Sequence, residues 1–300
     1  MVWRPTLPTK DSSRLDVRKT YKLYVGGVFP RSESGRSYVV SDAKGKFLAN
    51  ASQASRKDAR DAVVAARKAF GGWSARTAYN RGQVLYRIAE LLEGRRAQFV
   101  DELRSSEGLS AAAAERQVDD AIDVWVWYAG WADKYVQVAG NGNPVSGPYF
   151  NISTPEATGV VAVIAPQASS LLGLVSVVAP VILSGNTAVV VASERAPLAA
   201  ISLAEVLATS DVPGGVVNVL TGSASTIAPW LASHMDVNAI DLTGVAGVAG
   251  AAELTRNLEI AAAENLKRVR RAPAAEPDWT REPTLDAMTD FLETKTVWHP

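Results

Sequence analysis

The sequence predicts an α/β protein built on a Rossmann-like doubly wound parallel sheet, with an N-terminal helical segment and a small β hairpin. Four short apolar runs, each followed by a segment of helix length, predict strand–helix units in series. The runs are GVVAVIA at 159–165, TAVVV at 187–191, GVVNVL at 215–220 and NAIDL at 238–242. Because they are nearly unbroken and rich in β-branched residues, we expect helices on both faces of the sheet. Right-handed crossovers between such strands give the doubly wound topology.

The N-terminal part predicts mainly helices. Ser55 is placed to cap the first of them, with Asp58 three residues later near the positive end of the helix dipole. Apolar residues then recur at helical spacing in three stretches, which indicates helices that pack one face against a neighbour. The stretches lie at 59–70, 84–103 and 115–135, after a loose arm over 1–20 and a strand with a turn over 21–29.

The C-terminal part loses the strand–helix order. Residues 271–290 carry three prolines within RAPAAEPDWTREP and predict a linker, with a short helix expected over 284–291. Residues 291–300 predict a strand, because polar and apolar side chains alternate there. Leu292, Thr294, Thr296 and Trp298 share one face, and Glu293, Lys295 and Val297 share the other. We therefore divide the chain into an arm at 1–20, a domain at 21–270, a linker at 271–290 and a terminal strand at 291–300.

Charge and residue counts exclude several functions. Lys and Arg number 31, as do Asp and Glu, so the formal net charge is zero. Without an excess of cations, the chain lacks the electrostatic basis for binding nucleic acid or an anionic membrane surface. The sequence contains no cysteine, which excludes a thiolate as nucleophile or metal ligand. The two histidines, His234 and His299, are too few and too far apart in the sequence to indicate a metal site.

No segment has the pattern of a membrane span or a signal peptide. The most apolar stretch, 171–183, is about 13 residues long, whereas a span needs about 20. The first twenty residues are polar and lack an apolar core. We therefore expect a cytoplasmic protein.

Many short motifs occur in one order along the chain. They are KLYVGGVF near the start, DAVVAARKAFGGW at 61–73, YAGWADK at 128–134, ATGVVAVIAP at 157–166, APVILSGNTAVVVASE at 179–194, DVPGGVVNVLTG at 211–222, DLTG at 241–244, NLKRV at 265–269 and ETKTVWHP at 293–300. Together they resemble the aldehyde dehydrogenase superfamily, from about residue 22 to 269 and again at about 291–299. The resemblance implies a truncated, degenerate member that lacks the catalytic domain.

The resemblance implies that no catalytic residue is present. Members of the family use a cysteine nucleophile, a glutamate base and an asparagine that holds the oxyanion, and this chain has no cysteine. The glutamate position falls on Ala272, beside Pro273. The asparagine of the family's Pro-Trp-Asn motif is Ala168 here, and removing one oxyanion donor alone costs about 10²–10³ in rate.

The cofactor positions implied by the resemblance are also altered. The family's Lys-Pro-Ser-Glu reads Val-Ala-Ser-Glu at 191–194, and the Ser of Thr-Gly-Ser is Val245. The positions that would line a vestigial crevice are Ala165, Pro166, Glu194, Gly222, Thr243 and Gly244. The alternative interpretation is that Glu194 is an exposed carboxylate and that the two glycines serve turns after strands. We expect no cofactor, with NAD as the alternative occupant of the crevice.

The terminal strand suggests a different function. In the family, an oligomerisation hairpin built partly from such a tail extends the sheet of a neighbouring subunit, and the two pieces here are 138–153 and 292–298. An unpaired strand is costly in water, and donating it to another chain satisfies its backbone. The interface residues we expect are Val145, Tyr149, Leu292, Thr294, Lys295, Thr296, Val297 and Trp298.

Three functions stay open on the sequence. The leading hypothesis is a non-catalytic subunit that associates with a full-length aldehyde dehydrogenase as an assembly or regulatory partner. The alternatives are an NAD(P)-dependent aldehyde dehydrogenase acting by an altered route and a nucleotide-binding regulatory module. Self-association, through the tails or the helix expected at 248–257, is a variant of the first, since twofold dimers are common.

Overall fold

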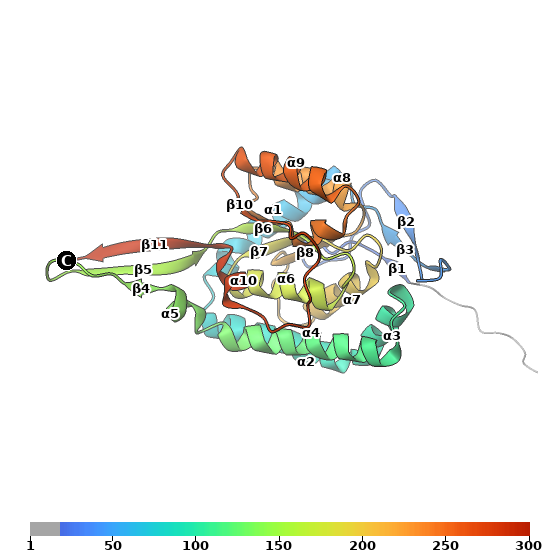
Figure 1. Cartoon of the computed structure of the whole chain (residues 1–300), viewed down its shortest axis with the longest axis horizontal. Helices are drawn as coiled ribbons and strands as arrows, with labels where there is room; N and C mark the ends of the chain where they lie inside the picture. The colour runs from blue at the N-terminus through green and yellow to red at the C-terminus, as the bar shows by residue number, and fades with distance from the viewer. Residues whose placement is uncertain (1–18) are drawn as a thin grey trace, which may run out of the picture.

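A computed structural model describes residues 19–300. The central element is a parallel sheet between two layers of helices, and a narrow arm of three strands projects from one side of this body (Figure 1). The loose arm predicted at 1–20 lies outside the described residues except for its last two. Thr20 already belongs to a short strand, β1 (Thr20–Tyr21), which pairs with β3 (Phe47–Ser52).

The parallel sheet confirms the doubly wound prediction. Its strands are β6 (Val160–Ile164), β7 (Thr187–Val191), β8 (Val217–Leu220), β9 (Ala239–Asp241) and β10 (Arg268–Arg270), in the order β10-β9-β6-β7-β8. Every residue of β6 and β7 is buried, as nearly unbroken apolar runs require. The chain winds from β6 outward in one direction and then in the other, so the strand order reverses beside β6.

Two helical layers cover the sheet (Figure 1). On one face lie α1 (Arg56–Ser74), α8 (Ala224–Ala232) and α9 (Ala251–Ala263), which pack against Val160, Ala162 and Ile164. On the other face lie α6 (Leu172–Leu183) and α7 (Leu198–Leu207), covered in turn by α2 (Ala78–Gly94), α3 (Arg96–Ser106) and α4 (Ala111–Trp131). The period of two along β6 sends alternate side chains into the two cores.

The helix cap predicted at Ser55 is present in the structure. Ser55 and Asp58 form a reciprocal capping box at the start of α1. The stretch 21–29 differs from its prediction, because only its first residue lies in a strand. Tyr24 instead forms an isolated antiparallel bridge to Val219 at the edge of the central sheet. A further strand, β2 (Ser37–Ser41), pairs with β3.

The projecting arm combines two distant parts of the chain. After α5 (Tyr135–Ala139), the strands β4 (Asn141–Gly142) and β5 (Phe150–Ala157) are joined by β11 (Leu292–His299) in the order β11-β5-β4. The two stretches expected to build one hairpin, 138–153 and 292–298, do lie together, since β11 pairs antiparallel with β5 over its full length. The family resemblance implied this pairing, whereas residue periodicity could not show it, because more than a hundred residues separate the two strands.

Residues 271–290 return from β10 to the base of the arm and lie against the domain. The short helix α10 (Leu285–Thr289) buries Ala287 and Met288 in the core under α6. At its end, the carbonyl of Phe291 accepts hydrogen bonds from Asn186 Nδ2 at 2.9 Å and from Thr158 Oγ1 at 2.7 Å. Asn186 is fully buried and also accepts a hydrogen bond from the Gly159 N–H at 2.8 Å. One amide thus joins the start of β6, the turn before β7 and the start of β11.

We predict that Asn186→Ala lowers the free energy of unfolding by about 2–3 kcal/mol, because it leaves the buried Gly159 N–H without an acceptor and removes one of the donors to the Phe291 carbonyl. Urea unfolding of the whole chain measures this loss. Asn257→Ala, on the exposed side of α9, is the matched control and should leave the stability within about 0.5 kcal/mol of wild type. Equal effects of the two substitutions would contradict the role assigned to Asn186.

Candidate functional site

The six predicted crevice residues all follow strands of the central sheet at its carboxyl edge. Ala165 and Pro166 come after β6, Glu194 after β7, Gly222 after β8, and Thr243 and Gly244 after β9. This edge is where ligands bind in doubly wound proteins. The structure brings the residues after β6 and β9 into contact, whereas Glu194 lies on the other side of β6 and Gly222 lies two strands away.

Gly244 is explained by packing alone. A Cβ atom at this position would lie 2.1 Å from the carbonyl oxygen of Ala165, so the backbones of the two loops touch. Thr243 is held just as locally, since its N–H donates to the buried Asp241 carboxylate at 2.8 Å. Gly222 has φ +128°, a conformation that favours glycine. The contacts of these three residues are therefore local to their loops.

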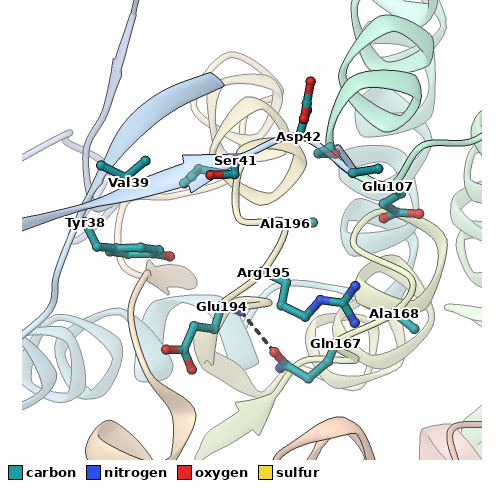
Figure 2. Close-up of a pocket in the computed structure, with 13 residues that line it drawn as sticks. Tyr38, Val39, Ser41, Asp42, Glu107, Gln167, Ala168, Glu194, Arg195 and Ala196 are labelled. Carbon is teal, nitrogen blue, oxygen red and sulfur yellow. Dashed lines mark hydrogen bonds between the residues drawn. The ribbon is translucent and has the colours of Figure 1, made fainter. Parts of the chain in front are cut away.

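Gln167 organises the site, and sequence reasoning assigned it no role. Its Nε2 donates to the Ala165 carbonyl at 2.8 Å, and its Oε1 accepts from the Glu194 N–H at 3.0 Å. Its own carbonyl accepts from Ser193 Oγ at 2.9 Å. Figure 2 shows the contact between Gln167 and the backbone of Glu194. The buried amide thereby ties the loop after β6 to the loop after β7. Its place in the Pro-Gln-Ala triplet was the one available signal.

These two loops form one wall of a polar cleft of about 600 Å³ (Figure 2). The opposite wall comes from β2 and the end of α3. The charged residues that line the cleft are Asp42, Glu107, Glu194 and Arg195, so carboxylates outnumber cations there. Burial raises the pKa of Tyr38, and the charge of Glu194 adds to this shift. The cleft therefore holds its phenol neutral and presents a polar, predominantly acidic surface.

Glu107 is the most deeply placed acid of the cleft. Its Oε1 accepts the N–H of Ser170 at 2.8 Å. Burial raises the pKa of Glu107, and the hydrogen bonds from Ser170 only partly offset that effect. The nearby charge of Glu276 pushes the pKa further in the same direction, while Arg195 opposes it. The folded chain thus holds the proton of this carboxyl group more tightly than the unfolded chain does.

The positions that the family resemblance marks as catalytic, and the two histidines, lie as follows. Ala168, at the position of the family's oxyanion amide, is exposed at its rim, and Ala272 follows β10. Neither histidine lines the cleft: His234 lies between α8 and β9, and His299 ends β11. Residues 19–300 contain no group of three or more metal-ligating side chains. The cleft is therefore a polar recess of carboxylates, hydroxyls and one arginine, without histidine.

A carboxylate from residues 271–290 reaches the loop after β6. Glu276 accepts the N–H of Gln167 at 2.5 Å and the N–H of Ala168 at 3.1 Å. It lies close to Gly247 in the loop after β9, where a Cβ atom would sit 2.4 Å from Glu276 Oε1. The segment that the sequence predicts to be a linker therefore contacts both loops of the crevice.

The predicted interface residues lie on the arm, with one difference. Trp298 is 61% exposed, and its ring lies 6.2 Å from that of Tyr149. Thr296 hydrogen-bonds Ser153, Lys295 pairs with Glu156 at 3.0 Å, and Val297 lies opposite Ile152. Thr294 is exposed, and Val145 is partly exposed between β4 and β5. Leu292, in contrast, is buried in the chain's own core and presents no free surface.

We predict that Glu107→Gln gains stability relative to wild type as pH rises. A raised carboxyl pKa stabilises the folded chain fully only below the unfolded pKa, and this contribution is lost as pH rises through the folded pKa. The variant retains an oxygen acceptor for Ser170 but cannot ionise. Its stability difference from wild type should therefore increase from about pH 4 to about pH 8, as measured by urea unfolding. The exposed Glu93→Gln should show no such trend, and a flat profile for both variants would contradict the assignment.

Comparison with known proteins gives a consistent result. The model of the aldehyde dehydrogenase family matches residues 29–270. A cytosolic aldehyde dehydrogenase 1 of Elephantulus edwardii is 32% identical over 253 residues, which cover 83% of this chain and 49% of that protein. Human retinal dehydrogenase 2 is 33% identical over 264 residues, which cover 85% and 48% of the two chains.

Solved structures agree in fold. The NAD⁺ complex of an aldehyde dehydrogenase from Bacillus cereus superposes with a TM-score of 0.77 at 25% identity, over 84% of this chain and 50% of that one. The chain thus spans about half the length of the relatives it matches. None of the helices among residues 19–300 combines the length and apolar character that crossing a bilayer requires.

Proposed function

The chain belongs to the aldehyde dehydrogenase family, and we propose that within it this chain is a non-catalytic subunit that joins a full-length aldehyde dehydrogenase through the outer edge of β11. Three features support the proposal: the side chains at the family's catalytic positions, the unpaired edge of the arm, and the aromatic residues beside that edge. The name of its cytosolic relative supports a cytoplasmic location.

The side chains at the catalytic positions cannot carry out the family's chemistry. The 300 residues hold no cysteine, and the positions of the base and of the oxyanion amide are occupied by Ala272 and Ala168. A serine hydroxyl or water needs a base to activate it, and the cleft offers no histidine and only the carboxylates of Asp42, Glu107 and Glu194. These substitutions favour a role in which the chain binds other molecules and leaves the chemistry to a partner.

The outer edge of β11 carries the proposal. In an antiparallel pair, opposite residues alternate between those that exchange hydrogen bonds and those whose backbone groups point away. The Thr158 N–H donates to the Phe291 carbonyl, so the alternation directs the backbone groups of Thr294, Thr296 and Trp298 away from β5. Among residues 19–300, β11 is paired on the β5 side only. An edge of this length is a template for strand addition.

Aromatic and aliphatic side chains line the end of the same arm. Phe150 is 70% exposed, Trp298 61%, Tyr149 49% and Ile152 44%. By the register of β5 and β11, Phe150 and Ile152 point to one face of the arm and Trp298 to the other. Several large exposed apolar groups on one short arm indicate an interaction surface, whereas single ones are ordinary. Their position on a projecting arm lets a partner reach both the edge and these side chains (Figure 1). A neighbouring sheet would thus gain backbone hydrogen bonds and buried aromatic area together.

We predict that Thr296→Pro abolishes association with a full-length relative. Proline removes an N–H that points away from β5, so the β5–β11 ladder keeps its hydrogen bonds, and an edge strand tolerates proline. Thr296→Ala is the matched control, because it loses the same hydroxyl contact to Ser153 but keeps the N–H. Co-expression with full-length aldehyde dehydrogenases, followed by size-exclusion chromatography with light scattering, should show co-elution of wild type and Thr296→Ala only.

The proposal fails if the chain elutes alone with every full-length relative tested, or if Thr296→Pro associates as well as wild type. Self-association appears in the same experiment as a homodimer formed without the relative. An assay of NADH formation with a panel of aldehydes, on material free of full-length relatives, tests the alternative that the chain is itself an NAD(P)-dependent enzyme. The nucleotide-binding alternative draws on the NAD⁺ bound to the Bacillus cereus protein and is tested by calorimetry with NAD, NADP and coenzyme A.

A further inference from the structure

The crevice between the loops after β6 and β9 is the position where the strand order reverses. β9 and β7 flank β6 on opposite sides, and the chain winds away from β6 in both directions. Doubly wound sheets bind ligands at such a point, outside the carboxyl ends of the strands, with anionic groups near backbone N–H donors and the start of the next helix. Here that position lies between residues 165–168 and residues 242–247.

The chain's own Glu276 occupies this position. Its two carboxylate oxygens lie within 3.1 and 3.2 Å of the Ala168 nitrogen, and one of them also accepts the Gln167 N–H. On the other side it touches Gly247, where a side chain of any size would displace it. An anion already accepts the two N–H groups that the crevice offers to a phosphate oxygen.

Trp279, three residues after Glu276, lies over the first turn of α6. A Cβ atom on Gly173 would lie 3.0 Å from Trp279 Nε1 and 3.0 Å from Pro166, so the indole rests on the start of the helix that follows β6. The ring also packs partly against the core. Glu276 and Trp279 therefore close two neighbouring parts of one crevice from a single short stretch of chain.

The Glu276 carboxylate is held by backbone N–H groups and not, within the part of the chain that the structure describes, by an ion pair. Glu276 takes part in none of the ion pairs of residues 19–300, and backbone N–H groups alone hold its carboxylate. The carboxyl of Glu107 lies close enough for the two like charges to raise the Glu107 pKa. Two acids, Glu107 and Glu276, therefore lie near the N–H groups of the same loop with Arg195 as the neighbouring cation, and a further anion there would add to their repulsion. A ligand phosphate can therefore enter only after Glu276 leaves.

We propose that residues 271–290 form an intramolecular gate, in which the Glu276 carboxylate occupies the phosphate position of the crevice and keeps dinucleotides out. This inference concerns the crevice and does not rest on the proposed assembly through β11. It makes two statements that are tested separately: the Gln167 and Ala168 N–H groups are blocked by Glu276, and the ligand class excluded by the block is a dinucleotide that carries a pyrophosphate.

The test compares Glu276→Gln with Glu282→Gln in the full chain. Glu282 is an exposed carboxylate of the same segment, so both variants lose the same charge and only the first alters the crevice. Glu276→Gln should bind NAD⁺ at least about tenfold more tightly than wild type by calorimetry, because a neutral amide competes less well for the two N–H groups. Amide exchange at 167–168 should also speed up in Glu276→Gln and not in Glu282→Gln.

Each of the following results would contradict the proposed gate. If Glu276→Gln binds NAD⁺ no better than wild type, including binding by neither at about millimolar NAD⁺, the gate is refuted. Adenosine carries no phosphate, so its binding reports the space opened by the substitution and not the competition between two anions. An equal increase in affinity for adenosine and for NAD⁺ in Glu276→Gln would contradict competition between anions. Glu276→Ala, which removes the acceptor altogether, should bind NAD⁺ at least as tightly as Glu276→Gln, and weaker binding by this variant would equally contradict the gate.

Discussion

The arrangement of this molecule depends on the hydrogen bonds to the Phe291 carbonyl. Asn186 and Thr158 fix that carbonyl at the base of the central sheet, while Met288 and Phe291 bury their side chains beneath α6. The contact sets where β11 begins on β5, and it limits the path of residues 271–290 from β10 across the domain. A buried amide with no water to replace its partners makes this junction specific as well as stable.

The junction at Phe291 connects the two surfaces of functional interest, the edge of β11 and the crevice contacted by Glu276. On one side the chain continues as β11 and presents an unpaired edge with aromatic residues beside it. On the other side the preceding residues lie over the crevice and place Glu276 on the N–H groups of Gln167 and Ala168. Under the two proposals, the edge of β11 serves a partner and the Glu276 carboxylate closes the crevice.

Periodicity in the sequence was sufficient for four of the five strands of the central sheet and the helices between them, because apolar runs such as TAVVV are buried on both faces. The fifth strand, β10, has Val269 as its one apolar residue, so no apolar run marked it. The capping box at Ser55 is local and was equally visible. The role of Gln167 and the contact between Gly244 and Ala165 depend on distances between loops from different strands, which no local pattern encodes. The pairing of β11 with β5 and the position of Glu276 are likewise long-range, and the prolines around Glu276 indicated only a linker.

The most direct test of the central claim, that β11 docks on the sheet of a full-length relative, is hydrogen exchange of the β11 amides before and after mixing with that relative. The account predicts new protection at Thr294, Thr296 and Trp298, whose N–H groups point away from β5, and little change at Lys295 and Val297, which already face it. Unchanged exchange at the first three amides in a mixture where the relative is properly folded would contradict the account.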